Sequence, residues 1–484
     1  MSESLKNKTV KGVSWSFLDN IANQGITFFV GLILARILTP EEYGLIGIIT
    51  IFIAVFNSIV DSGFSNALIR KSDVKDIDLN TVFISNMVMS VVLFFALFFS
   101  ASFIADFFSQ PQLKPLTQVM ASIVIINAFA IIQRTILVKR IDFKTQTKVS
   151  FIASITSGVI GVGMAFYGLG VWSLVGQQIS RQSLNTLFLW FYAKWYPKLQ
   201  FSWQSFKELF GFGWKLLVSG LIDTVWREIY QIVIGKCYTP AALGQYTRAH
   251  QFGSIFSSNL MTIVQRVSYP VLSTIQDDKK RMKNAYRQII KVSMLVTFVL
   301  MFGLAAVSQP MIQVLVGDQW LIAATFLPII CLQMVLYPLH AMNLNILQVQ
   351  GRSDLFLKLE IIKKCVAVIP LLLGIFINIY WMLCGSVVTG IFAYYLNSYY
   401  SGRFLDYPIT AQVKDILPSF GIAIVMAIAT YAISLLPLSP FTLLPLQVLA
   451  GAFVTLALCE WTQLEEYREI KKVLIPMFGK IIHR

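Results

Sequence analysis

The chain has 484 residues, of which 56% are hydrophobic and only 13% are charged. A soluble domain usually carries about 25% charged residues, so this composition excludes an ordinary soluble protein. The formal net charge of +15 would suit a nucleic-acid-binding protein, but the basic residues are spread over many short loops, which disfavours that class.

Apolar segments follow one another along almost the whole chain, and most are long enough to cross a bilayer, which takes about 20 helical residues. Because the backbone must satisfy its own hydrogen bonds in lipid, the spans are expected to be helices. The sequence therefore predicts an all-α polytopic membrane protein with 14 transmembrane helices. The predicted spans are residues 12–38, 41–66, 79–107, 113–136, 145–168, 170–193, 216–236, 240–268, 286–310, 321–348, 355–378, 380–402, 415–436 and 442–461.

The basic residues test this count. With a cytoplasmic N-terminus, the outer turns hold only Arg36, Lys114 and Lys236 of the 39 Lys and Arg residues. Most of the others lie in the inner segments, as the positive-inside rule requires. One missed helix would invert every later loop, so we expect both termini in the cytoplasm.

The chain repeats itself at a spacing of about 200 residues. ILARILTPEEYG (33–44) matches VIGKCYTPAALG (233–244), and WSLVG (172–176) matches WMLCG (381–385). An even number of helices per repeat keeps both copies in the same orientation, as in parallel repeats of transporters. We expect an N-lobe of six helices (1–193), an amphipathic linker on the cytoplasmic side (194–215), a C-lobe of six helices (216–405), and a final segment of two helices and a cytoplasmic tail (406–484).

Polar residues inside spans are costly and usually face a cavity or a partner. In chain order, the first helix carries Asp19, Asn23 and Gln24, the sixth Arg181, the seventh Asp223, Arg227 and Glu228, and the eighth Arg248, Asn259 and Arg266. The opening helices of the two lobes are expected to line a cavity between the lobes. The arginines would grip a phosphate, because the planar guanidinium bonds two oxygens at once, and the amides would suit sugar hydroxyls.

Other roles for these charges stay open. Asp223 and Arg227 are four residues apart and could pair on one helix, and Asp19 could neutralise an arginine across the lobes. Arg134 lies near a helix end and is expected to be a snorkelling anchor. Asp19, Asp223 and Glu228 are candidates for proton or sodium coupling, since a buried carboxylate can titrate near neutral pH.

Sequence motifs for catalysis are missing. The chain has no G-x-x-x-x-G-K-[ST], H-E-x-x-H or G-x-S-x-G pattern and no Cys/His cluster, so no ATPase, metal site or hydrolase is predicted. We expect a transporter rather than an enzyme, with no cofactor.

Five segments carry a resemblance to a known family: ILARILTPEEYGLIGI (33–48), DSGFSNALIRK (61–71), YGLGVWSLV (167–175), LGQYTRAHQF (243–252) and VSYPVLS (267–273). They resemble the Wzx-type polysaccharide repeat-unit flippases of the multidrug/oligosaccharidyl-lipid/polysaccharide exporter superfamily, in the lipopolysaccharide and colanic-acid exporter branch. The resemblance implies two six-helix lobes around a cavity in the bacterial inner membrane. The implied substrate is an undecaprenyl-pyrophosphate-linked oligosaccharide for O-antigen, capsule or exopolysaccharide, with a polysaccharide polymerase and a chain-length regulator as potential partners.

Three alternatives remain beside this interpretation. An ion-coupled multidrug exporter of the same superfamily should have a cavity dominated by acids and aromatics. A flippase for the peptidoglycan precursor lipid would share the fourteen helices. A membrane-embedded glycosyltransferase or polymerase would need sizeable outer loops, which the sequence does not have.

Overall fold

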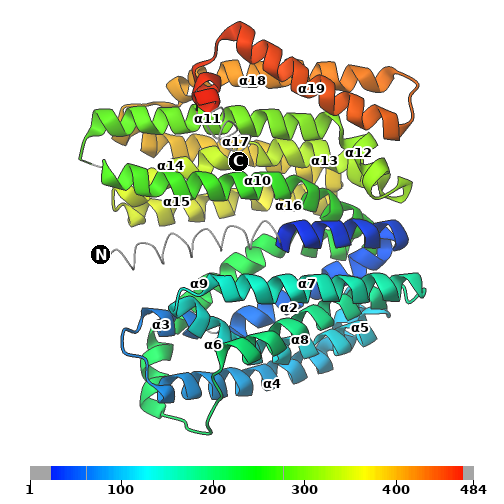
Figure 1. The fold of residues 1–484 in the computed structure, drawn as a ribbon, viewed down its shortest axis with the longest axis vertical. Helices are drawn as coiled ribbons and strands as arrows, with labels where there is room; N and C mark the ends of the chain where they lie inside the picture. Colours follow the sequence, from blue (N-terminus) through cyan, green and yellow to red (C-terminus); the bar gives the residue numbers. More distant parts are fainter. Residues whose placement is uncertain (1–22, 62, 276, 473–484) are drawn as a thin grey trace, which may run out of the picture. The chain divides into compact units, whose positions relative to one another are not determined.

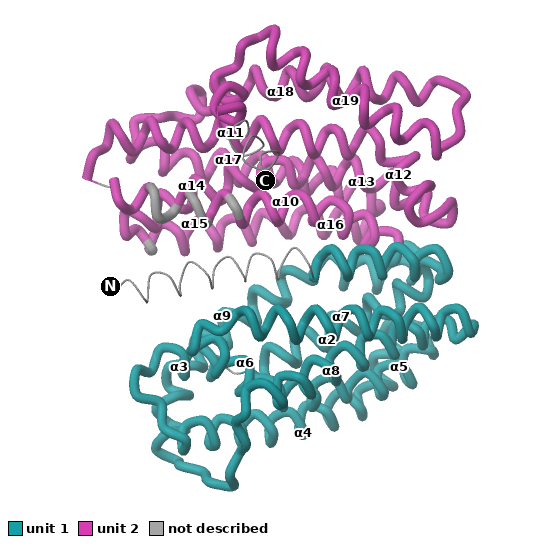
Figure 2. The backbone as a smooth tube through the Cα atoms, in the orientation of Figure 1, with its two compact units in different colours: residues 1–244 teal, residues 245–484 magenta. Residues whose placement is uncertain are grey.

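The computed structural model describes residues 23–61, 63–275 and 277–472, with the side chains of residues 263, 266, 267, 269–271 and 353 left out. The described residues form helices and no strands. The chain divides into two compact units, residues 1–244 (unit 1) and 245–484 (unit 2), coloured separately in Figure 2.

Unit 1 consists of long helices joined by short turns (Figure 1). After a first described helix (Asn23–Ile37), its elements are α2 (Pro40–Asp61), α3 (Phe64–Arg70), α4 (Asp76–Phe107), α5 (Leu113–Met120), α6 (Ser122–Lys139), α7 (Phe143–Phe166), α8 (Trp172–Ala193), α9 (Trp203–Cys237) and the first turn of α10 (Pro240–Thr274). Helix α8 packs against α7 and α6, and α9 packs against α2, α3 and α4.

Unit 2 holds the remainder of α10 and the later helices. These are α11 (Lys279–Ala306), α12 (Ser308–Leu315), η1 (Asp318–Trp320), α13 (Leu321–Met334), α14 (Tyr337–Val349), α15 (Ser353–Val366), α16 (Val368–Phe376), α17 (Ile379–Leu405), α18 (Ile409–Ala432), η2 (Ile433–Leu435) and α19 (Pro440–Thr462). Helix α17 packs against α13, α14 and α16, while α18 packs against α11 and α19.

Ten of the described helices are long and apolar enough to cross a membrane. The other predicted spans fall on the first described helix, on α8, on α10 and on α15 with α16. These segments are less apolar in part because α8 and α10 carry several of the polar residues singled out above. The total of 14 and the predicted lobe boundaries stay predictions.

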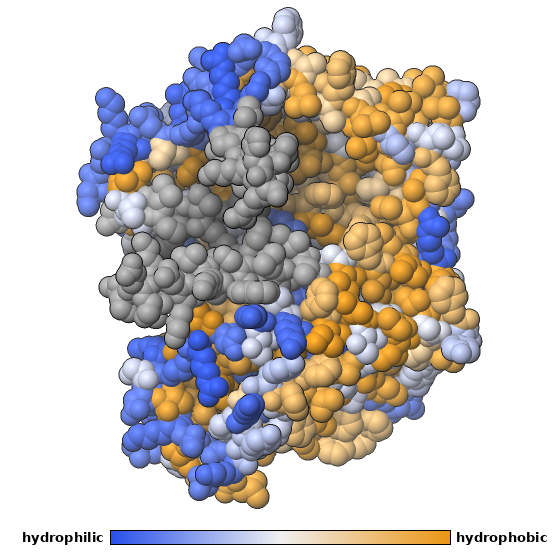
Figure 3. Space-filling model, in the orientation of Figure 1, coloured by the Kyte–Doolittle hydropathy of each residue, from blue (hydrophilic) through white to orange (hydrophobic). Residues whose placement is uncertain are grey.

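Hydropathy is distributed unevenly over the surface of unit 1. In Figure 3, its hydrophilic residues gather mainly at the end that carries α3 and the loop before α9. Hydrophobic residues cover most of the rest of the visible face of this unit. That polar end is the one that the charge pattern predicts to face the cytoplasm.

Each of the two Thr-Pro segments of the repeat begins a helix that a threonine hydroxyl caps. The amide of Glu42 donates to Thr39 Oγ1 at 3.4 Å, and the amide of Thr39 donates to the Glu42 carboxylate at 2.7 Å. This reciprocal pair is a capping box, with Pro40 in the first helical turn where its missing N–H costs nothing. At the second copy, the amide of Ala242 donates to Thr239 Oγ1 at 3.2 Å.

The same two segments touch each other within unit 1. A Cβ atom added to Gly44 would lie 1.8 Å from the carbonyl oxygen of Pro240, and one added to Gly244 would lie 1.9 Å from the carbonyl oxygen of Pro40. Only hydrogen fits at either position, so the glycines permit the starts of α2 and α10 to meet backbone to backbone.

A buried polar network joins helices of unit 2. The hydroxyl of Tyr286 on α11 donates to Asn343 Oδ1 on α14 at 2.9 Å, and the hydroxyl of Tyr394 on α17 donates to Gln412 Oε1 on α18 at 3.2 Å. Asn343, Gln412 and Tyr286 are fully buried. Because buried polar groups are costly unless they are paired, this network fixes how α18 sits on the earlier helices of the unit.

Candidate functional site

A run of polar residues on α8 faces the interior of unit 1. Gln177, Gln178, Arg181, Gln182 and Asn185 are spaced by one, four, five and eight residues, which places them on one broad helix face. All five line a cavity of about 650 Å³, which we call the α8 cavity. Leu189 of α8 lines it as well, and the other walls come from the first described helix, α2, α6 and α7, through Thr27, Thr50, Ile123, Arg134, Gln146, Ser150 and Ala153.

The α8 cavity carries positive charge. Two guanidinium groups, those of Arg134 and Arg181, line it, and the described lining residues include no Asp or Glu. Five glutamine and asparagine side chains each supply both hydrogen-bond donors and acceptors. The arrangement can hold an anion beside a hydroxyl-rich group.

Arg134 differs from its sequence-based prediction. It lies on α6, one and a half turns before the helix ends at Lys139, which suggested an anchor at the membrane surface. Its side chain is exposed, yet it lines the α8 cavity and also a second cavity of about 490 Å³. We call this second space the α3 cavity; residues of α2, α3, α6 and α9 line it, among them Asp61, Asn66 and Leu216. Asn127 and Arg134 are seven residues apart, a two-turn spacing that marks one polar face of α6.

A chain of amides crosses unit 1 between the two cavities. Gln182 Nε2 donates to Asn127 Oδ1 at 2.7 Å, and Asn127 Nδ2 donates to Asn57 Oδ1 at 3.1 Å. Gln182 lines the α8 cavity, whereas Asn57 and Asn127 line the α3 cavity. The cavities therefore adjoin, with Arg134 common to both.

The predicted residues of the first helix have different surroundings. Asp19 lies outside the described residues. Asn23 Nδ2 donates to Ser150 Oγ at 2.8 Å and its Oδ1 accepts from Ser154 Oγ at 3.0 Å, so it joins the first helix to α7. Gln24 is exposed. Asn23 thus supports the wall of the α8 cavity through Ser150, which lines it.

The predicted residues of α9 lie along one side of that helix. Asp223 and Arg227 are exposed, and Glu228 is half-buried and accepts a hydrogen bond from Gln231. Of the predicted site residues that the structure describes, Arg181 is the one that lines either the α8 or the α3 cavity. The roles assigned to the α9 residues stay predictions.

The eighth predicted span contributes to unit 2. Arg248 is buried, its Nη1 donates to Gln251 Oε1 at 2.8 Å, and its guanidinium lies 5.1 Å from the ring centroid of Trp320, a cation–π distance. Asn259 donates to the carbonyl of Ile255 at 2.6 Å. The side chain of Arg266 is outside the described part of the chain. The predicted role of Arg248 in binding stays a prediction, and its contact with Trp320 could not be foreseen because Trp320 lies far along the chain.

Comparisons with known proteins identify the family of the chain. Residues 33–325 match the family described as "Polysaccharide biosynthesis protein". The succinoglycan biosynthesis transport protein ExoT of Rhizobium meliloti is 25% identical over 69% of this chain and 67% of its own length. The lipopolysaccharide biosynthesis protein WzxC of Escherichia coli is 22% identical over 77% of this chain and 76% of its own.

Solved structures show the fold. The lipid II flippase MurJ in an inward closed conformation matches with a TM-score of 0.74 and 17% identity, over 94% of this chain and 99% of that one. An inward-facing multidrug resistance MATE transporter matches with a TM-score of 0.61 and 15% identity, over 79% and 96%. With its ten apolar helices, the protein is a multi-pass membrane protein with the transporter fold of this superfamily. The chain belongs to the polysaccharide biosynthesis protein family, which confirms the resemblance to Wzx-type flippases that its motifs indicate.

Proposed function

We propose that this protein is a flippase that moves undecaprenyl-pyrophosphate-linked oligosaccharide repeat units across the bacterial inner membrane by alternating access. The product would serve O-antigen, capsule or exopolysaccharide synthesis, and both termini would lie in the cytoplasm. The observation that carries the proposal is the α8 cavity, which combines two arginines with five amide side chains.

The chemistry of that cavity matches a pyrophosphate with sugars attached. Guanidinium groups form strong, charge-assisted hydrogen bonds with phosphate oxygens, and amides bond to hydroxyls as both donor and acceptor. The volume of about 650 Å³ falls in the range of about 300–1,000 Å³ that small-ligand sites occupy. A cavity for cationic drugs would need carboxylates instead, and the described lining residues include none.

The relatives support the same class of substrate. ExoT and WzxC are named for the biosynthesis of succinoglycan and lipopolysaccharide, which are saccharides, and MurJ is named as a flippase for a lipid. A lipid-linked saccharide is the substrate class that these names and the α8 cavity have in common.

Translocation in proteoliposomes tests the proposal. The vesicles would contain an undecaprenyl-pyrophosphate-linked oligosaccharide, and a membrane-impermeant lectin would report the arrival of the glycan at the outer leaflet. Each hydrogen bond to a charged group contributes about 1.5–3 kcal/mol, so Arg134→Gln and Arg181→Gln should each slow transport by about tenfold or more. The Arg→Lys variants should transport at rates between those of the parent and the Arg→Gln variants, because lysine keeps the charge and loses the planar guanidinium group.

Arg140→Gln is the matched control, because Arg140 caps the same helix as Arg134 and does not line either cavity of unit 1. It should transport at the normal rate. Normal transport by both cavity variants would contradict the proposal, and so would export of a cationic dye by a protein that leaves the oligosaccharide in place.

We further propose that a proton or sodium gradient drives transport, with Asp19, Asp223 and Glu228 as the coupling groups. No cofactor is needed in this scheme. If Asp19→Asn and Asp223→Asn both leave gradient-dependent transport unchanged, the coupling proposal is wrong, whereas the substrate proposal would stand. A polymerase and a chain-length regulator would act on the translocated product.

A further inference from the structure

The α3 cavity has a polar wall built from three helices of unit 1. Asn57 and Asp61 lie one turn apart on α2, Asn66 lies on α3, and Asn127, Arg134 and Thr135 lie on one face of α6. Its volume of about 490 Å³ is within the range of small-ligand sites. None of these residues except Arg134 also lines the α8 cavity.

The α3 cavity and the α8 cavity differ in the charges that line them. The α3 cavity is lined by one carboxylate, that of Asp61, and one guanidinium, that of Arg134. The α8 cavity is lined by two guanidiniums and, among the described residues, by no carboxylate. A phosphate is therefore favoured in the α8 cavity and repelled by Asp61 in the α3 cavity. A neutral group with many hydroxyls suits the α3 cavity, because carboxylate, amide and hydroxyl side chains can satisfy it without net charge.

Hydrogen bonds already orient the polar side chains of the α3 cavity before a ligand binds. Ser65 Oγ donates to Asp61 Oδ1 at 2.5 Å, and Thr135 Oγ1 lies 3.2 Å from Ser65 Oγ. Asn57 is oriented by the hydrogen bond from Asn127. Because these side chains lose little conformational entropy when a ligand binds, binding is more favourable than it would be to mobile side chains.

Helix α9 adds an aliphatic part to the lining of the α3 cavity. Leu216, Leu217 and Gly220 form this part. Gly220 leaves room, since a Cβ atom there would have Ser58 Oγ as its nearest neighbour at 3.7 Å. A pyranose ring has polar edges and apolar C–H faces, so a cavity lined by both polar and aliphatic side chains matches its chemistry.

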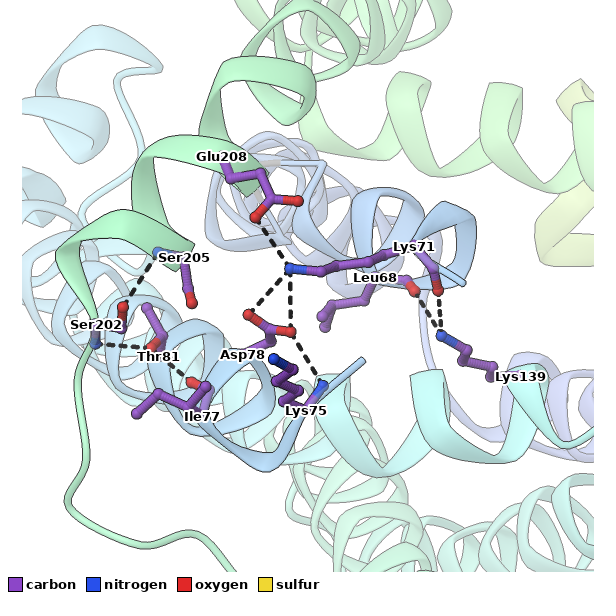
Figure 4. A network of polar contacts seen from close by, with 10 residues as sticks. All are labelled: Leu68, Lys71, Lys75, Ile77, Asp78, Thr81, Lys139, Ser202, Ser205 and Glu208. Atoms are coloured by element: carbon purple, nitrogen blue, oxygen red, sulfur yellow. Dashed lines mark hydrogen bonds and ion pairs between the residues drawn. The ribbon is translucent and has the colours of Figure 1, made fainter. Parts of the chain in front are cut away.

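Contacts at the polar end of unit 1 hold α3 and α9 in place (Figure 4). Lys71 Nζ lies 3.2 Å from a carboxylate oxygen of Asp78 and 3.0 Å from one of Glu208 on α9. Lys139 Nζ donates to the carbonyl oxygens of Leu68 at 3.2 Å and Lys71 at 2.5 Å. We call these five residues the clasp. It ties the ends of α3, α4, α6 and α9 together beside the α3 cavity.

A glycine completes the junction of α3 with α9. Gly63 has φ of +71°, and a Cβ atom there would lie 2.4 Å from the carbonyl oxygen of Gly213 on α9. Segment 61–71, one of the motifs of the family resemblance, therefore supplies Asp61, Ser65 and Asn66 to the cavity and Lys71 to the clasp.

We infer that the α3 cavity is a binding subsite for a neutral sugar residue of the lipid-linked oligosaccharide, next to the phosphate-binding α8 cavity. This inference rests on the proposed function. Asp61, Asn66 and Asn57 bond the hydroxyls, Leu216 and Leu217 cover a C–H face, and Arg134 stands between the sugar and the pyrophosphate.

Binding to the full-length protein in detergent tests the subsite with two probes. One is undecaprenyl pyrophosphate, which has no sugar, and the other is lipid-linked oligosaccharide extracted from the producing cells. Native mass spectrometry gives both affinities. Asp61→Asn and Asn66→Ala should each weaken binding of the oligosaccharide by about tenfold, the loss of one or two hydrogen bonds. Binding of undecaprenyl pyrophosphate should stay within about twofold.

Gln112→Ala serves as the control, because Gln112 is an exposed amide of unit 1 in the loop before α5 and lines neither cavity. It should bind both probes normally. Equal loss of both probes in Asp61→Asn and Asn66→Ala, or no loss of either, would overturn the subsite. Failure of the parent protein to bind undecaprenyl pyrophosphate would overturn the proposed function itself, which keeps the two failures distinguishable.

Discussion

Replacing Lys71 by methionine should destabilise the protein mainly through one of its two acidic partners. The Asp78 side chain is 2% exposed, whereas that of Glu208 is 58% exposed. Removing the partner of a fully buried charge costs about 3–5 kcal/mol. The amide of Lys75 still donates to Asp78 at 3.0 Å, and Lys71 itself is 23% exposed. We therefore expect Lys71→Met to lower the free energy of unfolding by about 2 kcal/mol.

Glu208→Gln breaks the other half of the clasp and should cost less than about 1 kcal/mol, as exposed ion pairs do. Adding Asp78→Asn to Lys71→Met should recover part of the loss, because no unpaired buried carboxylate remains. Denaturation of the purified protein, followed by tryptophan fluorescence, gives the three values. A loss in Glu208→Gln as large as that in Lys71→Met would refute the assignment of the energy to Asp78.

The pH dependence of the clasp has a definite sign. Burial lowers the pKa of Lys71, but hydrogen bonds from its ammonium to Glu208 and Asp78 outweigh this and raise the pKa above its ordinary value of 10.5. A raised pKa in the folded state means that the stabilisation is complete below the pKa of the unfolded chain and is lost as pH rises through the folded value. The difference between Lys71→Met and the parent should therefore persist at neutral pH and shrink as the pH rises above about 10.5.

Two further predictions concern the packing of each unit. Gly44→Val should abolish folding or lower the melting temperature severely, because its Cβ would meet the carbonyl oxygen of Pro240. Gly163→Val is the control and should be tolerated, because nothing lies within 4 Å of a Cβ atom at that position. Equal melting temperatures of the two variants would contradict the close approach. Tyr286→Phe should lower the free energy of unfolding by about 1 kcal/mol, because the amide oxygen of Asn343 loses one of its buried hydrogen-bond donors. A denaturation midpoint unchanged from the parent would show that this hydrogen bond contributes nothing.

The sequence predicts the parts of the fold and site that depend on local pattern. The repeated Thr-Pro segments both became helix starts, because the cap and the proline act within four residues of each other. Arg181 was singled out as a polar residue inside a predicted span, and it lines the α8 cavity.

What sequence reasoning missed depends on neighbours distant in the chain. Arg134 was interpreted as an anchor because its position on α6 is near the helix end, and only the packing of α2, α3 and α9 around it creates the α3 cavity. An apolar run also does not reveal that Gly63, inside the predicted span 41–66, adopts a left-handed conformation. Trp320 beside Arg248 depends on tertiary structure in the same way.

The mutual fit of Gly44 with Pro240 and of Gly244 with Pro40 bears on how a duplicated chain can diverge. In each of the two similar segments, a glycine without a side chain lies against the proline carbonyl of the other segment. A methyl group gained in one copy would have to be met by a backbone shift in the other, so neither copy can drift alone at this point. The two segments therefore constrain each other at the α-carbon hydrogens of Gly44 and Gly244.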